Sequence, residues 1–94
     1  MDSAVVTGAG SGIGAATCRR LAAQGVALVI HTGSHRAGAD AVAADCAAVP
    51  CRVVVGDLAE AATLDALIDA AQALGRLRGV VANAGFADRR PLAE

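Results

Sequence analysis

Glycine occupies alternate positions between Gly8 and Gly14, directly after the apolar run at residues 4–6. A short buried strand therefore leads into a loop with little side-chain bulk, and residues 15–24 are compatible with a helix. The backbone N–H groups at such a helix start, together with the positive end of the helix dipole, bind phosphate oxygens. The segment predicts a site for the pyrophosphate of a dinucleotide.

The glycines of this loop have separate expected roles. Gly8 permits the sharp exit from the strand, and Gly10 and Gly12 leave room for phosphate oxygens beside the backbone. Gly14 lets the helix lie close to the sheet. The full set of predicted cofactor contacts in this segment, which adds two hydroxyl side chains and one apolar residue, is Thr7, Gly8, Gly10, Ser11, Gly12, Ile13 and Gly14.

The spacing of these glycines alone leaves three interpretations open. Gly10-x-Gly12-x-x-Ala15 fits the general dinucleotide fingerprint, whereas Gly8-x-Gly10-x-Gly12 is a pattern met in methyltransferases that bind adenosyl cofactors. The third interpretation is a tight strand-to-helix turn that binds nothing. The lack of an acidic residue after the second expected strand weakens the methyltransferase interpretation.

The elements around the loop alternate between strand and helix. Strands are expected at residues 4–7, 27–30, 52–55 and 79–84, and helices at residues 13–24, 39–48 and 61–74. This order predicts an α/β fold, a Rossmann-type doubly wound parallel sheet with right-handed crossovers. The sheet is expected to be incomplete, with strand order 3-2-1-4. The fourth strand is then an open edge, where self-association or a partner chain is expected.

Periodicity also predicts which helix faces are buried. The residues expected to face the sheet are Ile13, Ala16, Thr17, Leu21 and Ala22 in the first helix and Leu64, Leu67, Ile68, Ala71 and Leu74 in the third. Residues 31–38 are expected to form a polar loop, with His31 and His35 exposed near the cofactor and not part of a metal site.

Three motifs in order resemble a known family. Thr7-Gly8-x-x-x-Gly12-x-Gly14 resembles the cofactor motif of classical short-chain dehydrogenases/reductases. Asp57-Leu58 is similar to the pair that meets the adenine ring in that family, and Asn83-Ala84-Gly85 to the element beside the cofactor ribose. The chain departs from the family pattern at Ala82, where the first of two asparagines is usual, and at Arg78, where an aspartate is common.

The resemblance implies hydride transfer between a nicotinamide cofactor and an alcohol or carbonyl compound, catalysed by a Tyr-x-x-x-Lys pair with a nearby serine. This chain contains no tyrosine and no lysine, and its serines do not match the family position. Residues 1–94 are therefore expected to be the N-terminal part of a single NAD(P)-binding Rossmann domain, without the catalytic part and inactive alone. The alternative is a non-catalytic dinucleotide-binding module, or a split protein that needs a partner chain.

The segment after the second expected strand favours NADP(H), although NAD(H) stays open. An NAD site places a carboxylate there for the ribose hydroxyls, and the first acidic residue after this strand is Asp40. Thr32, Ser34 and Arg36 are the candidate contacts to a 2′-phosphate. Ser11 argues the other way, because similar NADP-preferring enzymes often have a basic residue at that position.

Composition sets the remaining expectations. The formal net charge of −1 gives no basis for a nucleic-acid partner, and no apolar run is long enough for a membrane span. The N-terminus lacks the features of a signal peptide, so a cytoplasmic location is expected. Cys18, Cys46 and Cys51 are expected to be reduced, packed thiols, with a redox pair at Cys46 and Cys51 as the minor alternative.

Overall fold

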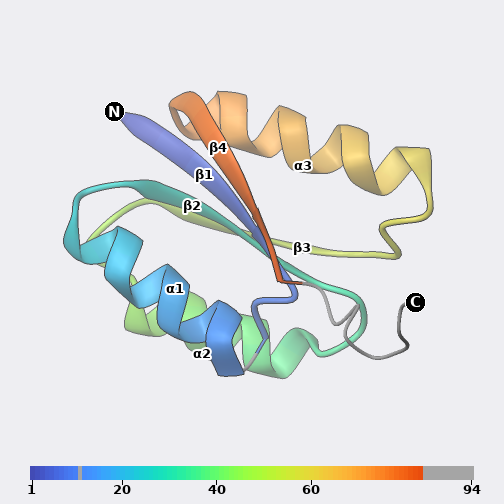
Figure 1. Cartoon of the computed structure of the whole chain (residues 1–94), viewed down its shortest axis with the longest axis horizontal. Coiled ribbons are helices and arrows are strands. Elements are labelled where there is room, and N and C mark those ends of the chain that lie inside the picture. The colour runs from blue at the N-terminus through green and yellow to red at the C-terminus, as the bar shows by residue number, and fades with distance from the viewer. Residues whose placement is uncertain (11, 84–94) are drawn as a thin grey trace.

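The protein folds into one parallel sheet with helices on both faces (Figure 1). The structure is a computed structural model that describes residues 1–10 and 12–83. Its elements are β1 (Asp2–Thr7), α1 (Gly12–Ala23), β2 (Ala27–Thr32), α2 (Arg36–Asp45), β3 (Cys51–Val55), α3 (Ala61–Leu74) and β4 (Arg76–Ala82). The strand order is β3-β2-β1-β4 with every pair parallel, which confirms the predicted Rossmann-type topology.

Two hydrophobic cores hold the layers together. Helices α1 and α2 cover one face of the sheet and α3 covers the other (Figure 1). Alternate residues of a strand point to opposite faces, so Val6 and Ile30 enter the core with α1 and α2, whereas Val5 and Val29 pack against α3. The carboxyl ends of all four strands consequently meet at the edge of the sheet where the glycine loop begins.

Helix α1 buries the predicted stripe only in part. Gly14, Ala15 and Cys18 are its buried residues, whereas Ile13 is 77% exposed. The predicted stripe started from Ile13 because it is the first large apolar side chain of the helix. Leu21 and Ala22 of the predicted stripe do pack against the core, whereas at the start of the helix small residues take the place of Ile13 and let the helix approach the sheet closely.

The element boundaries around β2 also differ from the prediction. The strand continues through His31 and Thr32, and α2 already starts at Arg36, so the expected polar loop shrinks to residues 33–35. Both additional strand residues pair with β3, His31 with Val54 and Thr32 with Val55. The ladder hydrogen bonds extend the strand beyond its apolar run.

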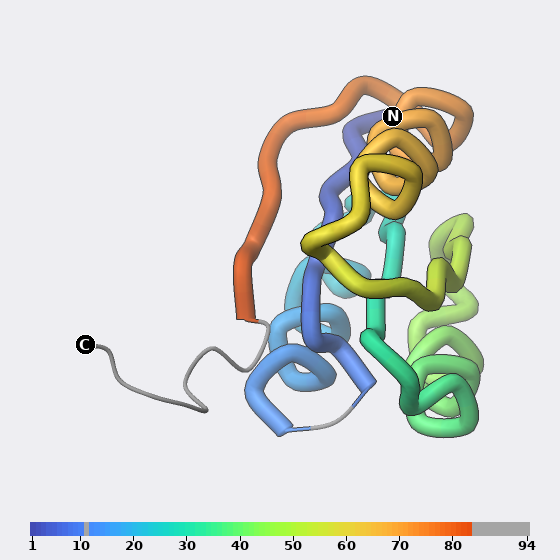
Figure 2. Tube along the Cα trace, turned by 90° about the vertical axis from the view of Figure 1, so that its right-hand side faces the viewer, coloured from blue at the N-terminus to red at the C-terminus, as the bar shows by residue number. Residues whose placement is uncertain are grey.

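Strand β4 lies along one side of the molecule with β1 as its neighbour (Figure 2). Its register with β1 shifts by one residue, because Leu77 pairs with Ser3 and Gly79 with Ala4. The extra residue, Arg78, forms an exposed ion pair with Asp2, with Nη1 and Oδ2 3.1 Å apart. Among the described residues, none of the helices combines the length and the apolar character that crossing a membrane requires.

Candidate functional site

The glycine loop leaves β1 with backbone geometry that favours glycine. Gly8 and Gly12 have φ angles of 62° and 64°, in the left-handed region. A Cβ atom at Gly12 would meet nothing within 4 Å, so the space beside the start of α1 is open. Neither α1 nor α2 has an acidic residue in its first turn. An anion beside these helix starts meets unpaired N–H groups and no opposing carboxylate there.

The other two glycines of the loop allow close packing. A Cβ at Gly14 would lie 2.6 Å from the Gly8 carbonyl oxygen, so α1 can touch the loop only with glycine at this position. A Cβ at Gly10 would lie 3.2 Å from Thr32 Oγ1, so Gly10 packs on the end of β2. The expected role of Gly14 fits this geometry, and the missing side chain of Gly10 allows the loop to pack closely on the end of β2.

Gly38 is a contact of the loop that the sequence interpretation missed. A Cβ on Gly38 would collide with the Gly10 carbonyl oxygen and would lie 2.9 Å from the His35 ring. The first turn of α2 is thus pressed against the glycine loop, which brings the starts of α1 and α2 to the same edge. A glycine in the first turn of a helix is the sequence signal that could have indicated this packing.

The three candidate 2′-phosphate contacts lie in different environments. Thr32 is buried, and its Oγ1 accepts a hydrogen bond from the His35 N–H at 3.1 Å. Ser34 and Arg36 are exposed beside the start of α2. The Arg36 guanidinium pairs with Asp40 one helical turn later, with Nε and Oδ2 3.6 Å apart. Ser34 and Arg36 can therefore reach a ligand, while the Thr32 hydroxyl shapes the turn.

His31 is buried, and the prediction that it is exposed is wrong. His31 is only 2% exposed, and both nitrogens of its ring contact backbone groups of other segments. Nδ1 accepts from the Gly8 N–H at 3.2 Å, and Nε2 lies 2.8 Å from the Gly56 carbonyl oxygen. No group of His, Cys, Asp and Glu within the described ranges could hold a metal ion.

The loop after β3 contains the predicted adenine-binding pair. The Asp57 carboxylate accepts a hydrogen bond from the Ala59 N–H at 2.8 Å, which closes a turn before α3. The residue that precedes α3 is Glu60, so Asp57 is not the cap of this helix. Asp57 is exposed, and one carboxylate oxygen remains free to accept from a ligand. Leu58 is half-buried and packs against the core under α3.

The end of β4 is fastened to β1 through Thr7. The Thr7 hydroxyl donates to the Val81 carbonyl at 3.3 Å and accepts from the Asn83 N–H at 3.0 Å. Within the described residues, Asn83 Nδ2 is buried and has no hydrogen-bond partner. A buried donor without a partner is costly, so this amide is suited to a polar group that a ligand brings. The predicted contacts Ser11, Ala84 and Gly85 lie outside the described residues.

These segments supply hydrogen-bond donors and an acceptor that fit a nicotinamide dinucleotide. The open start of α1 at Gly12 suits the pyrophosphate, and the exposed Asp57 suits the exocyclic amine of adenine. Asn83 adds a buried amide donor at the end of β4 that has no partner among the residues described. The segments meet at the carboxyl ends of the parallel strands, on both sides of the point between β1 and β4 where the strand order reverses.

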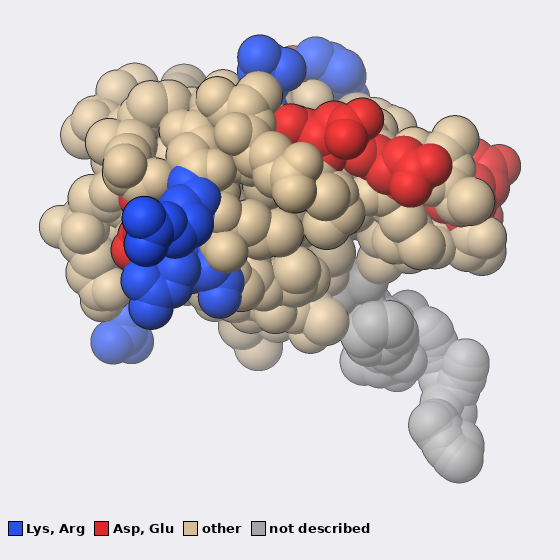
Figure 3. Space-filling model, turned by 90° about the horizontal axis from the view of Figure 1, so that it is seen from above, with Lys and Arg blue, Asp and Glu red and all other residues tan. Residues whose placement is uncertain are grey.

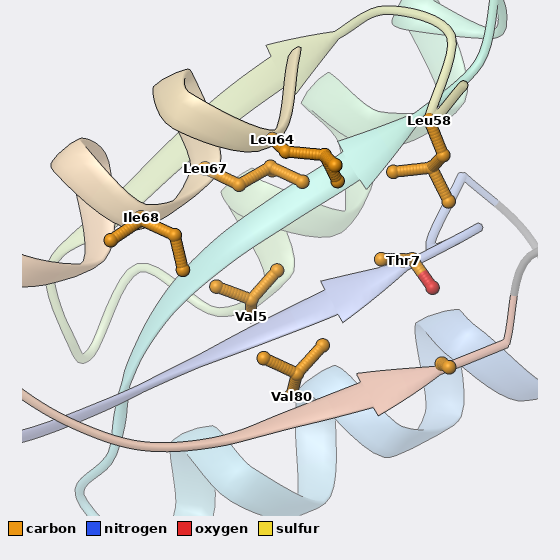
Figure 4. A pocket seen from close by; sticks show the side chains of 8 residues that line it. Val5, Thr7, Leu58, Leu64, Leu67, Ile68 and Val80 are labelled. Atoms are coloured by element: carbon orange, nitrogen blue, oxygen red, sulfur yellow. The ribbon is translucent and has the colours of Figure 1, made fainter. Parts of the chain in front are cut away.

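An apolar groove of about 420 Å³ runs between α3 and β4, beside this edge (Figure 4). Val5 and Val80 point into it from the sheet, facing Leu64, Leu67 and Ile68 of α3. Leu64 and Ile68 were expected to be covered by the sheet but are 48% and 38% exposed. Thr7 is the one hydroxyl residue in the lining, and its oxygen is already bonded to β4. The groove suits an apolar surface and not a phosphate.

The α3 side of the molecule carries exposed negative charge, which repels phosphate. Asp65 and Asp69 are exposed on this helix, and acidic side chains form a row across the view onto it (Figure 3). Basic side chains form two main groups in this view, one at the left and one at the top beside the start of that row (Figure 3). The helix start at Gly12 is thus better suited to a phosphate than the outer surface of α3.

The three cysteines are free thiols in or beside the core under α1 and α2. Burial, helped by the nearby Cys46 and Cys51, raises the pKa of the Cys18 thiol to about 12. Burial also raises the pKa values of Cys46 and Cys51. Thiols of raised pKa stay protonated and weakly nucleophilic, as expected for packing residues.

Known proteins match this chain in sequence and in structure. A family model described as short chain dehydrogenase matches residues 2–94. A cis-4-hydroxycyclohexanecarboxylate dehydrogenase of Sinomonas cyclohexanicum is 47% identical over 95 residues, covering 97% of this chain and 37% of the relative. An uncharacterized oxidoreductase of Methylorubrum extorquens is 45% identical over 85 residues, covering 87% of this chain and 34% of the relative.

A solved structure agrees with these matches. The crystal structure of 3-hydroxyacyl-CoA dehydrogenase type-2 from Mycobacterium avium superimposes with a TM-score of 0.80 at 34% identity, covering 89% of this chain and 32% of that protein. This chain spans about a third of the length of each of these three proteins.

Proposed function

Because this chain belongs to the short chain dehydrogenase family, a family of oxidoreductases, we propose that it binds a nicotinamide dinucleotide at the edge formed by its glycine loop. When bound, this cofactor supplies or accepts the hydride in reactions of alcohols and carbonyl compounds. The observation that carries the proposal is the start of α1, where Gly12 has a positive φ and open space in place of a side chain. The residues of this chain contribute binding and orientation.

The pyrophosphate is proposed to lie against the N–H groups at the start of α1. Ile13, 77% exposed at this helix start, would give the ligand an apolar contact. Asp57 would accept from the adenine amine, and the Leu58 N–H would donate to a ring nitrogen. Asn83 would donate its unpaired Nδ2 to the ribose side of the cofactor.

We propose NADP(H) as the preferred form of the cofactor. The start of α2 has no acidic residue in its first turn, and Ser34 and Arg36 are exposed beside it. A 2′-phosphate here would meet a guanidinium and free helix N–H groups. Asp40 weakens the preference, because it already pairs with Arg36.

We propose that residues 1–94 are the N-terminal part of a single Rossmann domain. A right-handed crossover after β4 would place a following helix on the α3 face, where the apolar groove lies open. The edge of β4 that no described strand pairs with would then take a further strand of the domain, or a partner chain. Since this chain has no tyrosine or lysine, it is expected to bind the cofactor without catalysing hydride transfer alone.

A titration with NADPH and NADH tests the proposal, using reduced-nicotinamide fluorescence and calorimetry, with an adenosyl cofactor as the competing ligand. We expect both nucleotides to bind, NADPH more tightly. Arg36→Ala should weaken NADPH binding about tenfold and leave NADH binding unchanged. Tighter binding of NADH by the unmodified chain would overturn the cofactor preference, and binding of the adenosyl cofactor alone would overturn the proposal.

Helix α1 offers a matched pair of glycines for the same assay. Gly12 and Gly25 lie at its two ends, both with positive φ and with nothing within 4 Å of an added Cβ. Substitution by alanine strains the backbone at both, at a cost of about 1 kcal/mol each. Only Gly12→Ala places a methyl group where the phosphates are proposed to bind. Equal dinucleotide affinity in the two variants would contradict the proposed site.

A further inference from the structure

His31 lies in the central part of the sheet and reaches two loops on opposite sides of its own strand. In the order β3-β2-β1, its strand β2 is the middle one. The imidazole contacts Gly8 at the end of β1 and Gly56 at the end of β3. By the alternation along β2, the side chain lies on the same face as Val29, the face that α3 covers.

The two contacts fix the tautomer of the ring. The Gly8 backbone N–H is only a donor, so Nδ1 must carry the lone pair that accepts at 3.2 Å. The Gly56 carbonyl is only an acceptor, so Nε2 must carry the proton and donate at 2.8 Å. Both nitrogens are thus used by backbone groups, which leaves the ring of His31 unavailable as a general base or a metal ligand.

Backbone hydrogen bonds of the same strand hold the same two loops. The His31 carbonyl accepts from the Ala9 N–H at 2.7 Å, and the Thr32 carbonyl accepts from the Gly56 N–H at 3.1 Å. Each loop therefore has one backbone bond and one imidazole bond to β2. Gly56 directly precedes Asp57, whose carboxylate closes the next turn. A movement at Gly56 would shift the carboxylate proposed to meet adenine.

We infer that His31 is a positioning residue, fixed as the Nε2–H tautomer, that sets the phosphate-binding loop and the adenine-binding loop at the spacing a dinucleotide needs. The link to a ligand rests on the proposed function, whereas the tautomer and the bonds to the loops do not. A buried ring that bridges two backbone segments allows little movement between them, because each unmade bond would leave a buried polar group without a partner.

Two conservative variants separate the two contacts. Asparagine places its amide near the position of Nδ1 and is too short to reach the Gly56 carbonyl, so His31→Asn keeps the contact with Gly8. Glutamine reaches the position of Nε2 and leaves the Gly8 N–H without its acceptor, so His31→Gln keeps the contact with Gly56. Each variant retains one of the two imidazole bonds and a polar side chain of similar size.

The first measurements use the full chain without nucleotide. Multiple-bond ¹⁵N–¹H correlation spectra should show an Nε2-protonated ring for His31, and the Nδ1–H tautomer or an averaged pattern would overturn the inference. Hydrogen exchange of the Gly8 amide should accelerate about tenfold in His31→Gln and stay near the unmodified rate in His31→Asn. The Ala9 amide, bonded to the His31 backbone, is the internal control. Unchanged Gly8 exchange in His31→Gln would contradict the bridge.

The last measurement is dinucleotide affinity, at a temperature where spectra show all variants folded. Both variants should bind NADPH about fivefold more weakly, the effect of one lost hydrogen bond. A purely structural role would lower their unfolding midpoints and leave the affinity of the folded protein unchanged, which would overturn the positioning role. Failure of the unmodified chain to bind any dinucleotide, with the Nε2–H tautomer and the Gly8 exchange as expected, would overturn the proposed function and the ligand part of this inference, and leave the bridge established.

Discussion

Strands β2 and β4 each contain an apolar run, at residues 27–30 and 80–82, and these two runs lie in opposite environments. Every residue of β2 is buried, including His31 and Thr32, whereas no residue of β4 is fully buried and Val80 is 55% exposed. Strand β2 has a neighbour on each side and helices over both faces, while β4, within residues 1–10 and 12–83, has only β1 beside it and an open apolar groove on the α3 face. The difference teaches that neighbours, and not hydrophobicity, decide which apolar strand is covered.

The largest expected difference in stability is between substitutions at two glycines, Gly14 in the packed start of α1 and Gly79 in the exposed strand β4. Gly14→Ala places a Cβ 2.6 Å from the Gly8 carbonyl, and should destabilise the protein by about 3 kcal/mol. Gly79→Ala in β4 meets nothing within 4 Å and should change stability by less than about 0.5 kcal/mol. Urea unfolding measures both, and equal losses would contradict the close packing of α1 on the loop.

The same substitution of a valine in β2 and of a valine in β4 sharpens the comparison, because the side-chain atoms removed are identical. Val29→Ala in β2 removes two buried methyl groups. It should lower the free energy of unfolding by about 2 kcal/mol, because the surrounding core cannot collapse fully into the space left. Val80→Ala in β4 should cost less than about 0.5 kcal/mol, since its side chain is already largely exposed. A comparable loss at Val80 would show that β4 is covered in solution, for example by a second copy, and sedimentation would then reveal the oligomer.

The buried thiols in the core under α1 and α2 should make the stability of the protein depend on pH. The pKa of Cys18 is about 12 in the folded protein and 9.0 in the reference state, so the unfolded chain loses the proton first. The contribution of Cys18 to the stability should be constant below about pH 8, fall by about 1 kcal/mol by pH 10 and continue to fall toward pH 12. No tyrosine or lysine titrates in this range.

Cys18→Ala is the control for this dependence. The variant should be somewhat less stable at neutral pH, because a packed sulfur is lost, and should show a shallower loss above pH 9. Denaturant unfolding at a series of pH values measures both proteins. An identical slope in the two would show that Cys18 is not the group responsible.

The smallest expected effect lies at the exposed edge. Arg78→Ala breaks the ion pair with Asp2, in which both side chains are largely exposed, so stability should fall by less than about 0.5 kcal/mol. The difference from the unmodified protein should shrink further in 0.5 M salt, where exposed charges are screened. A loss above about 1 kcal/mol would mean that Arg78 also holds the irregular register of β4.

The fold was largely predictable because its signals are local. Apolar runs, helical periodicity and the glycine loop predicted the order of all seven elements, and the Rossmann-type pattern that they indicate predicted the strand order of the sheet. Ile13 and His31 were assigned incorrectly for opposite reasons. A large apolar side chain was expected to be buried and a polar one exposed, but the first lies at the open loop and the second bridges two backbone segments.

The sequence by itself determined the glycine loop, the alternation of strands and helices and the parallel sheet, because these depend on backbone freedom and short-range periodicity. The tertiary structure decided that Gly10 packs on Thr32, that His31 joins two loops and that β4 lies exposed at the edge. These features depend on which segments meet in space. Burial and hydrogen bonding between residues 23 and 25 positions apart leave no pattern within a single element.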